Sequence, residues 1–150
     1  MRIKIRKAVR SDSDGLVRLI IELAEFEKLK PPDKKAKKRL LNDAFSKAPP
    51  FKIYVAESGN ELIGYAFYFF TYSTFLAKKS LYLEDIYITP KFRKSGIGKR
   101  FFKILIKEAK ENKCGRIEWA VLDWNINAIR FYENLGAKWL NDWKYYRLIL

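Results

Sequence analysis

The sequence predicts a mixed α/β fold in a single domain over residues 1–150, with a sheet that carries helices on both of its faces. A length of 150 residues suits one domain with a sizeable core. Hydrophobic residues make up 49% of the chain, which excludes a wholly disordered protein. Strand-like and helix-like patterns alternate, and no Gly/Ser linker, low-complexity tract or repeat interrupts them.

The first third of the chain predicts one strand and two helices. A short strand is expected over residues 3–9, where apolar and charged residues alternate. Capping residues at 12–14 begin a helix with apolar residues at helical spacing, and Pro31 and Pro32 end it because proline lacks the backbone donor. A second, very basic helix is expected over Asp33–Lys47 and stops before Pro49.

The rest of the chain predicts a hairpin and then alternating elements. The hairpin joins strands over Phe51–Glu57 and Leu62–Tyr72, and the second strand is apolar on both alternations, which is typical of a strand covered on both faces. The later elements are expected as a strand over Ser80–Thr89, a helix over Ile97–Asn112, a strand over Arg116–Leu122, a helix over Asn125–Leu135 and one or two closing strands over Trp139–Leu150.

Composition excludes several classes of site. Cys114 is the one cysteine, so no internal disulfide can form. The chain has no histidine, which excludes a Ser-His-Asp triad and leaves a metal site unexpected. The longest nearly unbroken apolar stretch, Leu62–Phe70, is about half of a membrane span, and the first residues have no signal-peptide core. A cytoplasmic protein that does not enter a membrane is expected.

The charge is strongly basic, with 31 Lys and Arg against 17 Asp and Glu, a formal +14. Such a balance attracts nucleic acid and anionic cofactors alike. The basic residues are dense only at 34–39 and 91–103, so most of this charge is interpreted as a solvated surface. A nucleic-acid-binding module, with steeply salt-dependent affinity, is the alternative from another functional class.

The segment around residues 83–100 carries the most specific pattern. A strand ends at Pro90, and a short turn leads into a helix that opens on Gly96-Ile97-Gly98 between cations. Glycine lets a backbone approach closely, and the N–H groups of a first helical turn have no intrahelical partner, so the pattern predicts a diphosphate site rather than a merely flexible turn. The Walker lysine and the third glycine of the dinucleotide fingerprint are absent.

Two motifs resemble those of a known family. Arg93-x-x-Gly96-x-Gly98 resembles the acetyl-CoA pyrophosphate loop of the GNAT acetyltransferases, and residues 123–137 resemble that superfamily's second signature. Segments such as Leu81–Asp85 and Val121–Asn125 are similar to the spermidine/spermine acetyltransferase branch. The resemblance implies the GNAT fold, a mostly antiparallel twisted sheet splayed at the cofactor site. It also implies acetyl-CoA as cosubstrate, a homodimer, and direct attack of an amine on the thioester.

The resemblance also implies the catalytic residues. Tyr132 matches the family's proton donor for the leaving thiolate, and Glu84 matches the base that acts through water. A primary amine with a pKa of ~10.4 is neutral roughly once in 2,500 molecules at pH 7, so the enzyme must remove a proton. Burial between Leu83 and Ile86 should raise the pKa of Glu84; alternatively, Glu84 only balances the charge of the amine. In a regular strand Asp85 would point to the opposite face, where a structural ion pair is its expected role.

Cofactor contacts are expected at the end of the strand, in the loop and at the later helix. The main chain of the strand should pair with the pantetheine arm, the loop should wrap the diphosphate, and Asn125 should bind the pantetheine. The residues expected to contact the cofactor are Ile86, Tyr87, Ile88, Arg93, Lys94, Ser95, Gly96, Ile97, Gly98, Lys99, Asn125 and Ala128.

The acceptor is expected to be a small cationic amine: a polyamine, a diamine, or a lysine- or thialysine-like compound. The candidate amine-site residues are Glu27, Asp85, Glu118, Trp119 and Asp142. Ser73 and Phe75 stand where the polyamine enzymes carry an acidic residue and a tryptophan, which puts spermidine itself in doubt. A protein N-terminal or lysine amino group is the alternative acceptor, and a catalytically inactive CoA sensor is the alternative with the same ligand.

Overall fold

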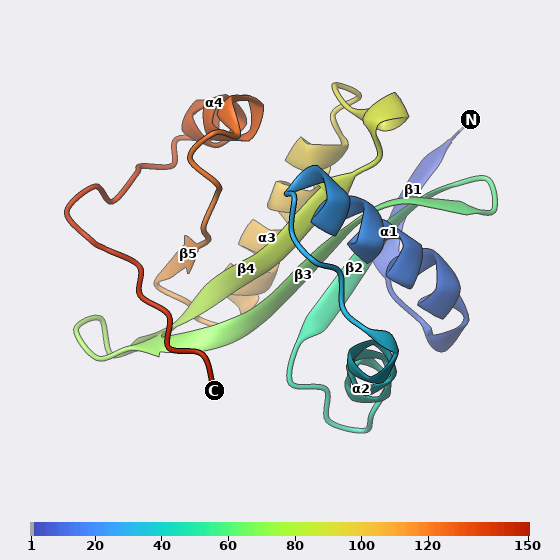
Figure 1. Cartoon of the computed structure of the whole chain (residues 1–150). Helices are drawn as coiled ribbons and strands as arrows, with labels where there is room; N and C mark the ends of the chain where they lie inside the picture. Colours follow the sequence, from blue (N-terminus) through green and yellow to red (C-terminus); the bar gives the residue numbers. More distant parts are fainter. Residues whose placement is uncertain (1) are drawn as a thin grey trace. The chain divides into compact units, whose positions relative to one another are not determined.

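A five-stranded sheet in sequence order forms the centre of the computed structural model, which describes residues 2–150 (Figure 1). Its strands are β1 (Ile3–Lys7), β2 (Lys52–Ser58), β3 (Glu61–Ser73), β4 (Lys78–Ile88) and β5 (Arg116–Glu118). Neighbouring strands are antiparallel except β4 and β5, which are parallel. The predicted mixed, mostly antiparallel sheet is therefore confirmed. The chain forms two compact units, one that ends at Trp119 and one over Ala120–Leu150.

Helices cover both faces of the sheet in the first unit. The helices α1 (Ser13–Phe26) and α2 (Lys34–Ala44) lie on one face, and α3 (Ile97–Glu111) lies on the other (Figure 1). The Asp33 side chain caps α2 by accepting from the Ala36 N–H at 2.8 Å. The second unit contains α4 (Ile126–Asn134), and 3₁₀ turns η1 (Arg10–Asp12) and η2 (Pro90–Phe92) precede α1 and α3. None of the helices in residues 2–150 has the length and apolar content needed to cross a membrane.

The strand β3 is buried on both faces, as its sequence predicts. Tyr65 packs in a cluster with Leu16 and Leu19 of α1. On the other face, Tyr68 stacks on Tyr54, whose hydroxyl donates to Glu108 of α3 at 2.7 Å. Both faces of β3 therefore contribute to the core, and the strand fixes the position of its neighbour β4.

The prediction of strands near the C-terminus is wrong in extent and in number. The strand expected over Arg116–Leu122 ends at Glu118, and the closing strands expected over Trp139–Leu150 are absent from residues 2–150. Large side chains of this segment, such as Trp139 and Tyr146, are exposed. Alternating apolar residues form a strand only where the backbone N–H and C=O groups find a neighbouring strand, and the second unit contains none.

An ion-pair network ties β1 to η1 and β2. The Arg6 guanidinium contacts the Asp12 carboxylate at 2.7 Å and the Glu57 carboxylate at 2.6 Å. Asp12 is buried, and the hydrogen bond from Arg6 holds the pKa of its carboxyl below the usual range. This contribution to stability is therefore present above the unfolded pKa of about 3.9 and is lost as the pH falls through the lower folded pKa.

We expect Arg6→Met to lower the free energy of unfolding by about 2 kcal/mol at pH 7, because it leaves buried Asp12 without its partner. Urea unfolding at pH 7 and below pH 3 measures the change, which should shrink at the lower pH. Lys107→Met removes an exposed pair with Glu111 and should change stability by less than about 0.5 kcal/mol. Equal effects of the two variants would contradict the stabilising role of the Arg6–Asp12 ion pair.

Candidate active site

One edge of β4 lies open over half of its length. The strand β5 pairs only with Ser80–Tyr82, whereas β4 continues to Ile88, and no strand of residues 2–150 pairs with the β5-facing edge beyond Tyr82. The Thr89 N–H donates to the Ile63 carbonyl of β3 at 2.9 Å, so the alternate residues Ile88 and Ile86 direct their main-chain groups to the open edge. This open edge agrees with the splay that the resemblance implies, and the contact of Ile86 and Ile88 with the cofactor stays a prediction.

The loop after β4 turns sharply before α3. Lys94 and Gly96 have left-handed backbones, with φ angles of 61° and 84°. The Ser95 hydroxyl donates to the Phe92 carbonyl and fastens the turn. A Cβ atom on Gly96 would meet no other atom within 4 Å, so the backbone of Gly96 borders open space. The backbone of the predicted loop is therefore accessible at the start of the helix α3.

The start of α3 offers hydrogen-bond donors to that surface. The first helical hydrogen bond runs from the Arg100 N–H to the Gly96 carbonyl at 3.1 Å, so the N–H groups of Ile97, Gly98 and Lys99 have no intrahelical partner. The helix dipole adds partial positive charge at this end. The N–H donors, the helix dipole and the accessible backbone at Gly96 together suit the linked phosphates of a nucleotide cofactor.

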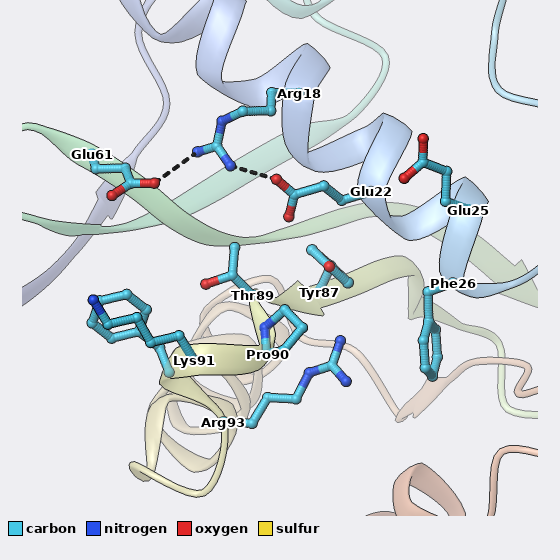
Figure 2. A pocket seen from close by; sticks show the side chains of 11 residues that line it. Arg18, Glu22, Glu25, Phe26, Glu61, Tyr87, Thr89, Pro90, Lys91 and Arg93 are labelled. Carbon is cyan, nitrogen blue, oxygen red and sulfur yellow. Dashed lines mark hydrogen bonds and ion pairs between the residues drawn. The ribbon is translucent and has the colours of Figure 1, made fainter.

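The Arg93 side chain lies on the α1 side of this loop. Its Nε donates to the Ile88 carbonyl at 2.9 Å, and its guanidinium lies 5.0 Å from the Phe26 ring and 5.5 Å from the Tyr87 ring. Figure 2 shows Arg93 reaching into a groove of about 830 Å³, whose far wall carries the ion pair of Arg18 and Glu22. In this structure the Arg93 side chain contacts Ile88, Phe26 and Tyr87. Its contact with a diphosphate stays a prediction.

A β-bulge interrupts β4 at Glu84. Phe67 of β3 pairs with Asp85, and Tyr68 pairs with Leu83, so Glu84 is the extra residue. The expectation that Asp85 lies on the opposite face from Glu84 assumed a regular strand, and the bulge makes β4 irregular at this point. The structural ion pair expected for Asp85 is wrong, because none of the ion pairs within residues 2–150 includes it. Instead, Asp85 accepts a hydrogen bond from the Tyr65 hydroxyl at 3.0 Å, on the face that α1 covers.

Three predicted residues gather beside this bulge: Glu27, Glu84 and Asp85, here called the acidic group. Burial, followed by the charge of Glu84, raises the pKa of Glu27. Burial raises the pKa of Asp85 to about 6. The hydrogen bond from Tyr65 lowers this pKa in part, and the negative charges of Glu84 and Glu27 raise it further. Glu84 itself is exposed, so the burial that the sequence predicts for Glu84 is found at Asp85.

The other predicted amine-site residues of the first unit have contacts around β5 and α3. Glu118 forms an ion pair with Arg116 at 2.9 Å, and the Trp119 ring meets the Phe102 ring edge-on at 5.1 Å. No three Asp, Glu, Cys or His side chains in residues 2–150 are arranged to hold a metal ion. The role of Glu118 and Trp119 in amine binding stays a prediction.

The second unit carries the remaining predicted residues. The Asn125 side chain caps α4 by accepting from the Ala128 N–H at 3.3 Å. Tyr132 lies on α4, with its ring 5.7 Å from that of Phe131, and Asp142 is exposed beyond the helix. The helix is as predicted to within one residue at each end, and the functional roles of these residues stay predictions.

The sequence did not predict that Tyr65 contacts one of the candidate site residues, Asp85. Its place in an apolar strand made it a core residue, which it also is. The available signal was weak: a hydroxyl-bearing side chain in a strand of the hairpin that precedes Glu84 and Asp85. Only the pairing of β3 with β4 brings this hydroxyl to Asp85.

Comparisons with known proteins agree with this geometry. The model of the Acetyltransferase (GNAT) family matches residues 17–137. Thialysine N-epsilon-acetyltransferase of Mus musculus is 40% identical over 147 residues, which cover 93% of this chain and 86% of that protein. The Homo sapiens spermidine/spermine N(1)-acetyltransferase-like protein 1 is 35% identical over 141 residues, 89% of this chain and 20% of that protein.

A solved structure, an integron cassette protein from the mobile metagenome of V. cholerae, superposes with a TM-score of 0.82 at 25% identity, over 99% of this chain and 93% of that one. The family match spans the open edge of β4, the loop before α3 and the helix α4. The chain therefore belongs to the GNAT family and is an acetyltransferase.

Proposed function

We propose that the protein transfers the acetyl group of acetyl-CoA to a primary amine of a small cationic acceptor, in the first place a lysine- or thialysine-like one. The observation that carries the proposal is the acidic group at the bulge of β4, on the strand whose open edge leads to the loop before α3. Carboxylates there suit an ammonium acceptor. The thialysine acetyltransferase of the mouse, at 40% identity, supports the same class of acceptor.

The chain has the groups needed to hold the cosubstrate. The N–H groups at the start of α3 bind the diphosphate, with Lys94 and Lys99 beside them. The main chain of Ile86 and Ile88 pairs with the pantetheine arm as a further strand would. Bound acetyl-CoA supplies the thioester that the amine attacks. The open edge of β4 and the open backbone at Gly96 support these contacts.

The acidic group addresses the main chemical obstacle, the proton of the acceptor. At pH 7 the neutral form of an amine with pKa ~10.4 costs about 4.6 kcal/mol. A carboxylate of the acidic group takes one proton, with Glu84 as the base predicted from the resemblance, and the amine nitrogen then attacks the thioester carbonyl. The C–S bond breaks, and Tyr132, a prediction from the same resemblance, gives a proton to the thiolate. The amine nitrogen releases its second proton as the amide forms, and a proton from solvent restores the Tyr132 hydroxyl.

Two residues favour a lysine-like acceptor over spermidine. Ser73 is buried, and its hydroxyl accepts from the Leu76 N–H at 3.2 Å, so it serves the β3–β4 turn. Phe75 is 96% exposed. Neither position supplies the carboxylate that the polyamine branch carries there. A homodimer and a cytoplasmic location stay predictions beside this proposal.

A turnover screen tests the proposal. Acetyl-CoA is incubated with thialysine, lysine, a diamine, spermidine and a basic peptide, with thiol release and product mass as readouts. We expect turnover with thialysine and lysine, less with spermidine, and none with the peptide. Turnover with the peptide alone would indicate a protein acetyltransferase. No turnover with any amine, together with salt-dependent binding of DNA or RNA, would favour the nucleic-acid module.

We expect Glu84→Gln to lower kcat/KM for the amine by about 10²-fold, because positioned acid–base groups contribute 10²- to 10⁴-fold. Steady-state kinetics at saturating acetyl-CoA measures the loss. Glu111→Gln, an exposed glutamate at the end of α3, is the matched control and should leave kcat/KM unchanged. A loss below threefold in Glu84→Gln would remove this residue from the chemistry.

A further inference from the structure

The helix α2 carries a row of exposed cations on its outer side. These are Lys34, Lys35, Lys38 and Arg39, here called the basic face. At 3.6 residues per turn, the four side chains fall within about 140° of the helix circumference. The opposite side carries Leu40 and Ala44, which pack against the core. This packing holds the basic face toward the solvent.

Carboxylates do not neutralise the basic face. None of the ion pairs within residues 2–150 includes one of its four side chains. The neighbouring Asp33 side chain accepts from the Ala36 N–H at 2.8 Å and caps the helix. Asp43, four residues after Arg39, likewise takes part in none of these ion pairs. The face therefore remains free to pair with an anionic ligand.

The placement of these cations is unfavourable for the helix itself. Lys34 and Lys35 lie in the first turn of α2, where the helix dipole already adds positive charge. Each of the two also has a like charge four residues later in the helix. The helix α3 shows the favourable arrangement, with a Lys107–Glu111 ion pair at 3.6 Å and Lys110 in the last turn. Residues that lower the stability of their own element are typical of a surface kept for binding.

The length and charge of the basic face suit a nucleic-acid duplex. Residues 34–39 span about 7.5 Å of helix at a rise of 1.5 Å per residue. A duplex carries one phosphate per ~1.7 Å of its axis, so about four phosphates meet the four cations over this length. A helix that binds a membrane surface also offers apolar side chains, whereas Leu40 and Ala44 of α2 pack against the core. These features favour a phosphate backbone over a lipid surface.

We propose that the basic face of α2 docks the protein on the phosphate backbone of a nucleic-acid duplex, in addition to acetyl transfer. Phosphate contacts carry no direct sequence information, so this binding is independent of base sequence. None of the four residues is among the candidate site residues, and the docking does not rest on the proposed function. Docking brings the enzyme to a polyanion that also attracts small cationic amines as counterions.

The test is the fluorescence anisotropy of a labelled DNA duplex of about 20 base pairs, titrated with the full chain between about 50 and 200 mM salt. Four phosphate contacts predict a slope of about −3.6 for log K against log salt, a loss of about 10²-fold in affinity over this range. A second duplex of unrelated sequence should bind within about threefold of the first. A wild type that binds neither duplex at the lowest salt overturns the proposal.

Neutralising the basic face should remove this binding. The variant that combines Lys34→Gln, Lys35→Gln, Lys38→Gln and Arg39→Gln is expected to bind at least about tenfold more weakly at the lowest salt, with a slope shallower than about −1. Its unfolding midpoint in urea should not fall below that of the wild type, because the replaced charges are unfavourable for α2. Unchanged affinity for the duplex, or a marked loss of stability, contradicts the role assigned to the face.

A matched variant separates the basic face from the net charge. It replaces four exposed lysines elsewhere by glutamine: Lys78, Lys107, Lys110 and Lys113. Both variants lower the formal charge of +14 by four, and the matched variant should bind the duplex within about threefold of the wild type. Equal weakening by the two variants would show that net charge alone drives the binding.

Three further probes locate the binding and identify the class of partner. Saturating CoA should leave the duplex bound, because the loop before α3 is not part of the basic face. Competition by CoA would place the duplex at that loop and overturn the proposal. Vesicles that contain phosphatidylserine, and polyglutamate, should both bind more weakly than the duplex at equal salt. Tighter binding of either one, lost in the variant of the basic face, would overturn nucleic acid as the partner.

Discussion

Tyr132→Phe is expected to lower kcat by about 10²-fold while leaving the affinity for CoA unchanged. The reaction expels a thiolate whose conjugate thiol has a pKa of about 8.5, and a positioned proton donor speeds such a step by 10²- to 10⁴-fold. A thiolate is a fair leaving group by itself, so the lower end of that range applies. Steady-state turnover and a CoA titration on the same preparation separate the two effects.

The control for this variant is Tyr146→Phe, which removes a hydroxyl from an exposed tyrosine of the same unit and should leave kcat unchanged. Turnover of Tyr132→Phe at the wild-type rate would contradict the assignment of the proton donor. A wild-type protein that binds CoA but acetylates no amine would instead fit the CoA sensor.

Gly96→Val is expected to weaken CoA binding by about 10²-fold. Gly96 has a φ of 84°, a conformation that costs a residue with a Cβ atom roughly 1–2 kcal/mol. The new side chain would also occupy the open space in front of the N–H groups of α3, where the phosphates are proposed to bind. Calorimetric titration with CoA measures the loss, and unfolding measures the strain separately.

Gly136→Val is the matched control, because Gly136 also has a left-handed φ, 90°, and open space around its Cβ position. It should lose comparable stability and bind CoA within about twofold of wild type, since it lies after α4 and not at the start of α3. Equal weakening by both substitutions would show that strain alone, and not the phosphate site, explains the effect.

Local signals predicted most of the fold. The helix expected over Ile97–Asn112 is α3 (Ile97–Glu111), and the hairpin strands expected around the 58–60 turn are β2 and β3, because periodicity, caps and turn residues act over a few neighbours. The closing strands failed because a strand also needs a partner. The bulge at Glu84 could not be predicted, since it depends on the register between β3 and β4.

In the candidate site, too, local sequence signals predicted some features, whereas others depend on contacts between distant segments. The loop at Gly96 was predicted from spacing and motif, and Glu84 was predicted from the family resemblance. The hydrogen bond from Tyr65 to Asp85 and the turn of Arg93 toward Phe26 depend on packing between segments far apart in the chain. The sequence predicts burial for Glu84, but in the structure Glu84 is exposed and Asp85 is half-buried. The bulge in β4 accompanies this difference, and the sequence of the strand alone does not predict the bulge.

Calorimetric titration of the purified protein with CoA tests the central claim, that main-chain N–H groups at the start of α3 hold the linked phosphates of the coenzyme. The account predicts a saturable heat with about one CoA per chain, and much weaker binding of pantetheine, which lacks the diphosphate. Absence of any heat with CoA or acetyl-CoA, at concentrations that saturate other enzymes using this cosubstrate, would contradict it.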